Sequence, residues 1–238
     1  MDTAPLARMR QLPLGVRIPD RAVFATFLPG RDAEAVQHLK ELGRGRLSGT
    51  AWISGARGAG KSHLLQATCV LASERLRAGY LPLRELASCG SGTLEGLGEL
   101  DCLCLDDIDA VAAQPDWARA LFGLHREVEE RGGMLIASAQ RPPALASWAL
   151  PDLGSRWTAS AVFQLKGLED AEVLEALKLR ASARGIELPE GTARWLQRRF
   201  PRDMRSLYDL LDALDEESLI ERRRLTVPFI RAVLARRN

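Results

Sequence analysis

The chain has 238 residues, of which 46% are hydrophobic and 27% charged, as is ordinary for soluble globular proteins. Its formal net charge of +2 gives no strong overall attraction to nucleic acid, so any DNA binding is expected to be local or indirect. The sequence shows neither the ~20 apolar residues of a membrane span nor an apolar run after Arg8 and Arg10 that would make a secretory signal, so we expect a cytoplasmic protein with no membrane partner.

Short apolar strands alternate with helical patterns up to about residue 167. The expected strands lie at residues 50–54, 80–86, 101–107, 134–139 and 161–165. The expected helices of this region lie at 60–79, ending at Gly79, and at 115–133. Strands that alternate with helices favour a parallel sheet covered on both faces, so we predict an α/β fold with five parallel strands.

After Leu168 the pattern becomes entirely helical. Helical segments are expected at 169–185, 189–200, 202–224 and 226–237, with breaks at glycine or proline between them. We therefore predict three parts of the chain, which are an N-terminal tail at 1–20, a nucleotide-binding core at 21–167 and a small helical lid at 168–238.

The segment 55–62, "GARGAGKS", lies between the first expected strand and a helix and fits G-x-x-x-x-G-K-[ST]. Glycines let backbone N–H groups surround phosphates, while Lys61 would neutralise the β- and γ-phosphate oxygens and Ser62 would ligate Mg²⁺. The expected cofactors are ADP or ATP with Mg²⁺, and the base is expected near Phe24 and Phe27. The predicted nucleotide-binding residues of the core are Gly55, Gly58, Gly60, Lys61, Ser62, His63 and Phe27.

Acidic residues follow the buried strand pattern of "CLCLDDIDAV". Carboxylates at the carboxyl end of a parallel strand lie at the edge of the sheet where phosphates bind. Asp106 is the expected Mg²⁺ partner, through water. Asp107 is expected to orient the water that attacks the γ-phosphate, whereas Asp109 is expected to be solvated.

A P-loop core followed by a helical lid resembles the AAA+ class. The resemblance implies a polar sensor on the fourth strand, Ser138 or Gln140. It also implies an arginine finger acting in trans, Arg156, which we expect in a turn before the fifth strand, and a lid arginine over the phosphates, Arg205 rather than Arg202. The alternative for any of these arginines is a surface charge, which for Arg156 means a salt bridge to Asp152 or another local acid.

Several stretches resemble the DnaA replication-initiator family, and more closely its small regulatory branch, Hda. They are "SGARGAGKSHLLQA", "LCLDDIDAV", "SAQRPP", "LPDLGSRW" and "LTVPFIRAVL", and the similarity runs from about residue 10 to 236. The stretch 87–100 is short where initiators carry an insertion, and the chain ends at Asn238 where initiators continue into a helix-turn-helix domain. Gln140 departs from the family's initiator branch, which has Asp at this position.

The tail segment "QLPLGV" (11–16) resembles the sliding-clamp motif of this branch, with Gln11 as a polar anchor and Leu12, Leu14 and Val16 for an apolar pocket. The alternative is a tail strand that packs on the chain's own core. The resemblance implies DnaA and the β sliding clamp of DNA polymerase III as partners, with DNA reached through the clamp, and leaves a homo-oligomer possible.

The resemblance implies a negative regulator of replication initiation that holds ADP and promotes hydrolysis of DnaA-bound ATP. Two alternatives stay open. The first is an autonomous ATPase or helicase loader, because Lys61 and Asp107 are intact, although we expect the chain's own ATPase to be weak or absent. The second is a clamp adapter without finger chemistry.

Overall fold

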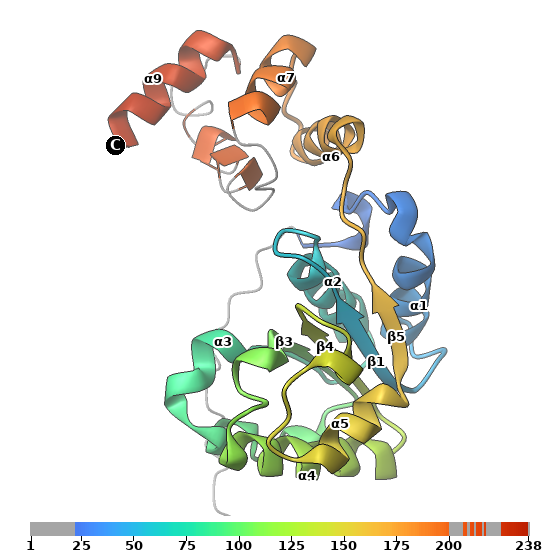
Figure 1. Ribbon diagram of the computed structural model, residues 1–238. Helices are drawn as coiled ribbons and strands as arrows, with labels where there is room; N and C mark the ends of the chain where they lie inside the picture. The colour runs from blue at the N-terminus through green and yellow to red at the C-terminus, as the bar shows by residue number, and fades with distance from the viewer. Residues whose placement is uncertain are drawn as a thin grey trace, which may run out of the picture.

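The computed structural model describes residues 22–199, 207, 208, 210, 211, 213–215, 217 and 225–237. Figure 1 shows a sheet flanked by helices and, beyond the last strand, a separate group of helices. No helix within these residues is long and apolar enough to cross a membrane.

One sheet of five parallel strands forms the centre of the core, as the sequence predicted. The strands are β1 (Gly49–Ser54), β2 (Ala78–Pro82), β3 (Cys102–Asp106), β4 (Met134–Ala139) and β5 (Ala161–Gln164). They are arranged in the order β2-β3-β4-β1-β5. Because all five run the same way, the residues that follow β1, β2 and β3 meet at one edge of the sheet.

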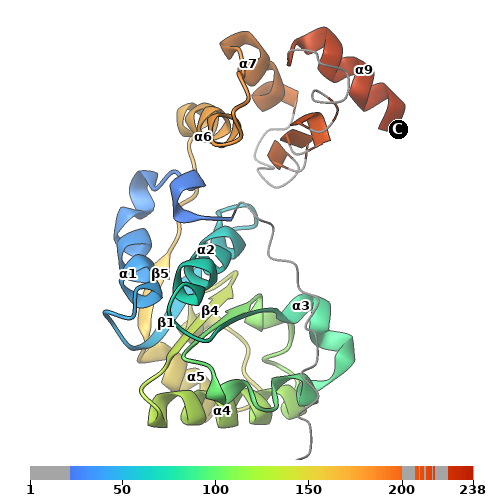
Figure 2. The same cartoon turned by 180° about the vertical axis from the view of Figure 1, so that it is seen from behind.

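Helices cover both faces of the sheet (Figures 1 and 2). They are α1 (Ala33–Gly43), α2 (Lys61–Ser73), α4 (Pro115–Glu130) and α5 (Pro151–Thr158), and a short turn of helix, α3 (Leu83–Leu86), follows β2. Side chains alternate along the strands, so Trp52 and Leu103 pack against α4 and α5 while Ile53 and Cys104 pack against α1 and α2. Burial on both faces explains why β3 reads as a continuous apolar run.

Three expectations about the secondary structure of the core were wrong. The helix after the P-loop ends at Ser73, and Gly79 lies inside β2, where a Cβ would come within 2.7 Å of a Leu100 methyl. This glycine therefore serves a close approach rather than a helix end. The strand expected over 80–86 ends at Pro82, which an edge strand tolerates, and the chain then turns into α3. The stretch 151–157 is the helix α5 rather than a turn, because Pro151 occupies its first position.

The helical group after β5 has its own apolar core. It contains α6 (Asp170–Ser182), α7 (Glu190–Arg199) and α9 (Val227–Arg237). Each helix contributes buried residues to one apolar cluster, such as Leu177, Leu196 and Phe229. Pro228 falls in the first turn of α9 rather than between helices, because the first turn does not need its missing N–H. Arg31 of the core contacts Glu169, just before α6, at 3.0 Å.

Candidate nucleotide-binding site

The loop between β1 and α2 adopts backbone angles that require glycine. Gly58 and Gly60 have φ angles of 83° and 95°, in the left-handed region that L-residues rarely adopt. A Cβ on Gly60 would come within 2.6 Å of the Phe27 ring. The loop can therefore curl only with glycine here, and it ends at the N-terminus of α2, where free N–H groups favour anions.

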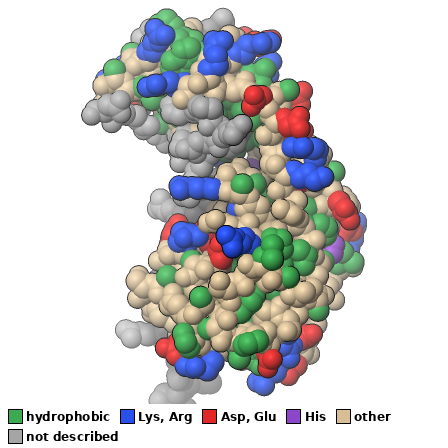
Figure 3. Space-filling model, in the orientation of Figure 1, with side chains coloured by type: hydrophobic (Ala, Val, Ile, Leu, Met, Phe, Trp, Pro, Cys, Tyr) green, Lys and Arg blue, Asp and Glu red, His purple; other side chains and the backbone are tan. Residues whose placement is uncertain are grey.

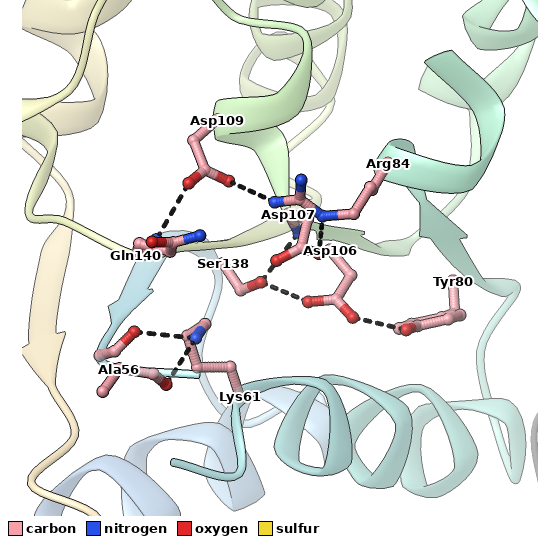
Figure 4. A network of polar contacts seen from close by, with 10 residues as sticks. Ala56, Lys61, Tyr80, Arg84, Asp106, Asp107, Asp109, Ser138 and Gln140 are labelled. Atoms are coloured by element: carbon pink, nitrogen blue, oxygen red, sulfur yellow. Dashed lines mark hydrogen bonds and ion pairs between the residues drawn. The ribbon is translucent and has the colours of Figure 1, made fainter. Parts of the chain in front are cut away.

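Lys61 and Ser62 open α2 at the end of this loop. The Lys61 ammonium, only 7% exposed, donates to the carbonyl oxygens of Gly55 at 2.8 Å and Ala56 at 3.0 Å (Figure 4). Burial lowers the pKa of Lys61, and the charges of the nearby aspartates oppose that effect. Ser62 is exposed beside it. The loop thus presents one cation and one hydroxyl at the edge of the sheet.

Two hydroxyl groups hold the carboxylate of Asp106, which is 4% exposed. The Tyr80 hydroxyl on β2 donates to Oδ2 at 2.6 Å, and the Ser138 hydroxyl on β4 donates to Oδ1 (Figure 4). Burial and the charge of Asp106 raise the pKa of Tyr80 far above its usual range, so Tyr80 keeps its proton. Neighbouring strands on both sides of β3 therefore fix the orientation of this carboxylate.

Asp107 is the only described residue other than glycine with a positive φ, 54°. Its backbone N–H donates to the Ser138 hydroxyl at 3.0 Å, and its Oδ2 accepts from Arg84 Nε at 2.7 Å. The Arg84 guanidinium also lies 3.8 Å from Asp109. Asp109, expected to be solvated, has a side chain that is only 27% exposed, and it accepts from the Gln140 backbone N–H at 3.3 Å. Of the two candidate sensors, Ser138 contacts both Asp106 and Asp107, the acidic pair that follows the apolar part of β3.

Sequence reasoning missed Arg84. The residue was placed in a strand, whereas it lies in α3, two residues after Pro82, which pairs in register with Asp106. That register brings the chain after β2 next to the chain after β3. The sequence does show a basic residue shortly after the second strand. Pairing it with Asp107 requires knowing that the second and third strands are neighbours, and local sequence does not contain the strand order.

The segment before α1 contacts α2 beside the loop. His63 Nε2 lies 3.0 Å from the Val23 carbonyl and 3.4 Å from the Thr26 hydroxyl. The Phe27 and His63 rings meet edge to face, with centroids 5.4 Å apart, whereas the Phe24 ring lies under the Lys40 ammonium of α1. Burial lowers the pKa of His63 to about 4, so the ring is neutral at pH 7. The structure therefore brings Phe27 and His63 together at the loop.

Arg156 lies on α5, and Figures 1 and 2 both place α5 at the end of the sheet away from the start of α2. Its Nη1 donates to Oε2 of Glu129 on α4 at 2.6 Å, and its guanidinium lies 4.9 Å from the Phe122 ring centroid. The local acid is thus Glu129 and not Asp152. Arg156 is not part of the site that the loop forms.

The residues of the loop edge fit a magnesium nucleotide. Mg²⁺ prefers oxygen ligands and usually binds through one or two carboxylates together with phosphates and water. The Ser62 hydroxyl and the Asp106 carboxylate are donors of that type. Within the described part of the chain no three His, Cys, Asp or Glu side chains form a metal cluster.

Some predicted site residues lie outside the described residues. They are the lid arginine Arg205, its weaker alternative Arg202, and the clamp motif residues Gln11, Leu12, Leu14 and Val16.

Comparison with known proteins links both parts of the chain to replication proteins. Residues 170–234 match the family model described as "Hda, lid domain". Domain III of the replication initiation protein DnaA from Thermotoga maritima has 20% identity and a TM-score of 0.73, with 91% of this chain and 96% of that chain covered. AMPPCP-bound DnaA from Aquifex aeolicus has 19% identity and a TM-score of 0.67, with 83% and 66% covered. Aeropyrum pernix ORC1 in complex with DNA has 19% identity and a TM-score of 0.66, with 92% and 67% covered.

A five-stranded parallel sheet with a P-loop, an acidic pair after β3 and a helical lid defines a AAA+ protein. Residues 170–234 are similar to the Hda lid domain, and the chain shares its fold with domain III of DnaA. At identities near 20% the solved structures establish the fold alone, and the family match is confined to residues 170–234.

Proposed function

We propose that this protein is a negative regulator of replication initiation that acts on DnaA together with the DNA-loaded sliding clamp. The observation that carries the proposal is the place of Arg156, on α5 and away from the chain's own phosphate loop. An arginine in this place serves a nucleotide held by a neighbouring protein. The lid match to Hda supports DnaA as that neighbour.

The proposed action of Arg156 is electrostatic. Its guanidinium spreads positive charge over the γ-phosphoryl oxygens of DnaA-bound ATP as hydrolysis proceeds, and a finger supplied in trans is worth about 10³–10⁵ in rate. Lysine does not replace it, because an ammonium lacks the planar fork of donors.

The chain's own loop holds a nucleotide, which we propose is ADP. Backbone N–H groups of 55–62 surround the phosphates, Lys61 turns from the loop carbonyls to the phosphate oxygens, and Phe27 with His63 borders the base. Bound Mg²⁺ neutralises phosphate charge, with Ser62 and Asp106 as its protein-side oxygen donors. Arg205 is proposed to close over the phosphates from the lid.

Contact with DNA is proposed to run through the clamp, which the segment 11–16 binds. On the face shown in Figure 3, basic and acidic side chains are interspersed rather than gathered into one basic patch. The net charge of +2 agrees with this arrangement. We also propose that the protein acts in the cytoplasm and that it can form a homo-oligomer.

An autonomous ATPase remains the competing function, because Lys61 and the acidic pair are present. The ion pair between Arg84 and Asp107 weighs against it, since the acid that would orient water is already engaged. Turnover of ATP by the purified protein alone supports this competitor, whereas turnover that requires DnaA and clamp supports the regulator.

The test is conversion of DnaA-bound ATP to ADP, measured with and without this protein and the DNA-loaded clamp. Arg156→Ala and Arg156→Lys are expected to keep fold, nucleotide and clamp binding but to lose stimulation. Arg126→Ala is the matched control, because Arg126 lies on α4 and pairs with Glu130 in the same helix. Full stimulation by folded Arg156→Ala removes the finger mechanism and leaves the clamp adapter.

A further inference from the structure

The Arg156 guanidinium contacts two side chains of α4, Glu129 and Phe122. Nη1 lies 2.6 Å from Glu129 Oε2, and the guanidinium carbon lies 4.9 Å from the Phe122 ring centroid. The Arg156 side chain is 34% exposed and that of Glu129 is 60% exposed. The contact is therefore at the surface, where a partner protein can reach it.

Glu129 has one cationic partner in this cluster. The buried His125 ring lies 3.9 Å from the same Oε2, beyond hydrogen-bond distance. Burial lowers the pKa of His125, so its ring is neutral at pH 7 and the carboxylate interacts with Arg156 as the charged group. The negative charge of Glu129 is thus directed at Arg156.

Glu129 and a phosphate group compete for the Arg156 guanidinium. A carboxylate at hydrogen-bond distance neutralises part of the positive charge, and it also repels an incoming anion. We propose that Glu129 restrains Arg156 on α4 and that this contact must open before Arg156 reaches the phosphates of a partner's nucleotide. The inference rests on the proposed function, because it assigns a restraint to the same finger.

The expected size of the restraint follows from its exposure. Exposed ion pairs shift an equilibrium by about two- to fivefold. Removing the Glu129 charge is therefore expected to raise the fraction of Arg156 available to the partner, and with it the rate, by about two- to fivefold. The Glu129–Arg156 contact is proposed to open after this protein has bound DnaA. The concentration of protein that gives half-maximal stimulation is therefore expected to stay the same.

The test compares Glu129→Gln with Glu130→Gln, its neighbour on α4, which pairs with Arg126 instead. Both variants lose one negative charge, so a general effect of surface charge appears in both. We expect Glu129→Gln alone to raise the maximal rate of DnaA-bound ATP conversion in the presence of DNA-loaded clamp. The double variant Glu129→Gln with Arg156→Ala is expected to match Arg156→Ala. A maximal rate for Glu129→Gln at or below wild type overturns the restraint.

A second measurement does not depend on DnaA. The side-chain N–H signals of Arg156, assigned in ¹⁵N-arginine NMR spectra by comparison with Arg156→Lys, are expected to shift in Glu129→Gln and not in Glu130→Gln. If the Arg156 signals do not shift in Glu129→Gln, the contact is absent in solution and the inference is overturned. Shifted signals together with full stimulation by Arg156→Ala overturn the proposed finger instead, so the two failures are distinguishable.

Discussion

Arg84 donates through Nε to Oδ2 of Asp107 at 2.7 Å, across the ends of two neighbouring strands. Asp107 is held in a left-handed conformation with φ 54°, and the Ser138 hydroxyl accepts its backbone N–H. A carboxylate engaged in this way is a poorer acceptor for water. The relationship therefore bears directly on whether the chain hydrolyses its own nucleotide.

The first prediction is that Arg84→Ala raises ATP hydrolysis by the protein alone. The substitution frees Asp107, and since the pair is partly exposed, the rise is expected to be about two- to fivefold. Steady-state release of phosphate measures it. Arg77→Ala is the control, because Arg77 makes a comparable pair with Asp101 at the opposite end of β2 and β3. Unchanged turnover in Arg84→Ala shows that the ion pair does not limit hydrolysis.

The second prediction compares two buried serines at the ends of neighbouring strands. The Ser138 hydroxyl donates to the Asp106 carboxylate, whereas that of Ser54 donates to the Phe163 carbonyl at 3.2 Å. Hydrogen bonds to charged groups contribute about 1.5–3 kcal/mol and neutral ones about 0.5–1.5 kcal/mol. Ser138→Ala is therefore expected to lower the free energy of unfolding, measured in urea, more than Ser54→Ala. Equal losses would show that the charge of Asp106 adds nothing to this bond.

The third prediction concerns nucleotide binding by the loop. A ligand at 100 times its Kd raises the free energy of unfolding by about 2.7 kcal/mol, which for a chain of this size raises Tm by about 5–10 °C. ADP and ATP with Mg²⁺ are expected to give this shift, and Lys61→Ala is expected to reduce it. Lys40→Ala, on α1, serves as the control for loss of a positive charge. Absence of any shift with adenine nucleotides in the wild type contradicts the assignment.

The fourth prediction concerns the tail. Gln11→Ala combined with Leu12→Ala is expected to abolish binding to the sliding clamp and to leave the nucleotide-induced Tm shift unchanged. Extended peptides concentrate their binding free energy in a few anchor residues, so losing two is expected to cost more than about 2 kcal/mol. Surface plasmon resonance on immobilised clamp measures this, with Arg8→Ala combined with Arg10→Ala as the control for charge. Wild-type affinity in the anchor variant excludes the tail as the tether.

Patterns within a few residues of each other predicted most of the core. The apolar run of β3 ends at Asp106, and the loop 55–62 lies between a strand and a helix, so parallel strands alone place both at one edge. Short apolar segments located all five strands, although β2 lies at 78–82 instead of 80–86, and only β3 and β4 are buried along their whole length.

Features that depend on contacts between distant segments could not be predicted. Gly79 suggested a helix end, but it is required by the approach of Leu100. The pairs Arg84 with Asp107 and Arg156 with Glu129 join residues 23 and 27 positions apart. Each pair depends on which strands or helices are neighbours, and periodicity carries no such information.

The fifth prediction concerns the pH dependence of stability through His63. Burial against the segment that includes Val23 and Thr26 lowers its pKa to about 4, from an ordinary value of 6.5. Between these two values the unfolded chain binds a proton that the folded chain excludes, so stability falls as pH falls from 6.5 towards 4. His63 alone is expected to remove about 2 kcal/mol between pH 7 and pH 5. His63→Gln keeps a polar, uncharged side chain at this position, so the loss between the two pH values, measured by urea unfolding, is expected to be smaller by that amount. An identical loss in wild type and His63→Gln would show that the acid sensitivity of the fold comes from other groups.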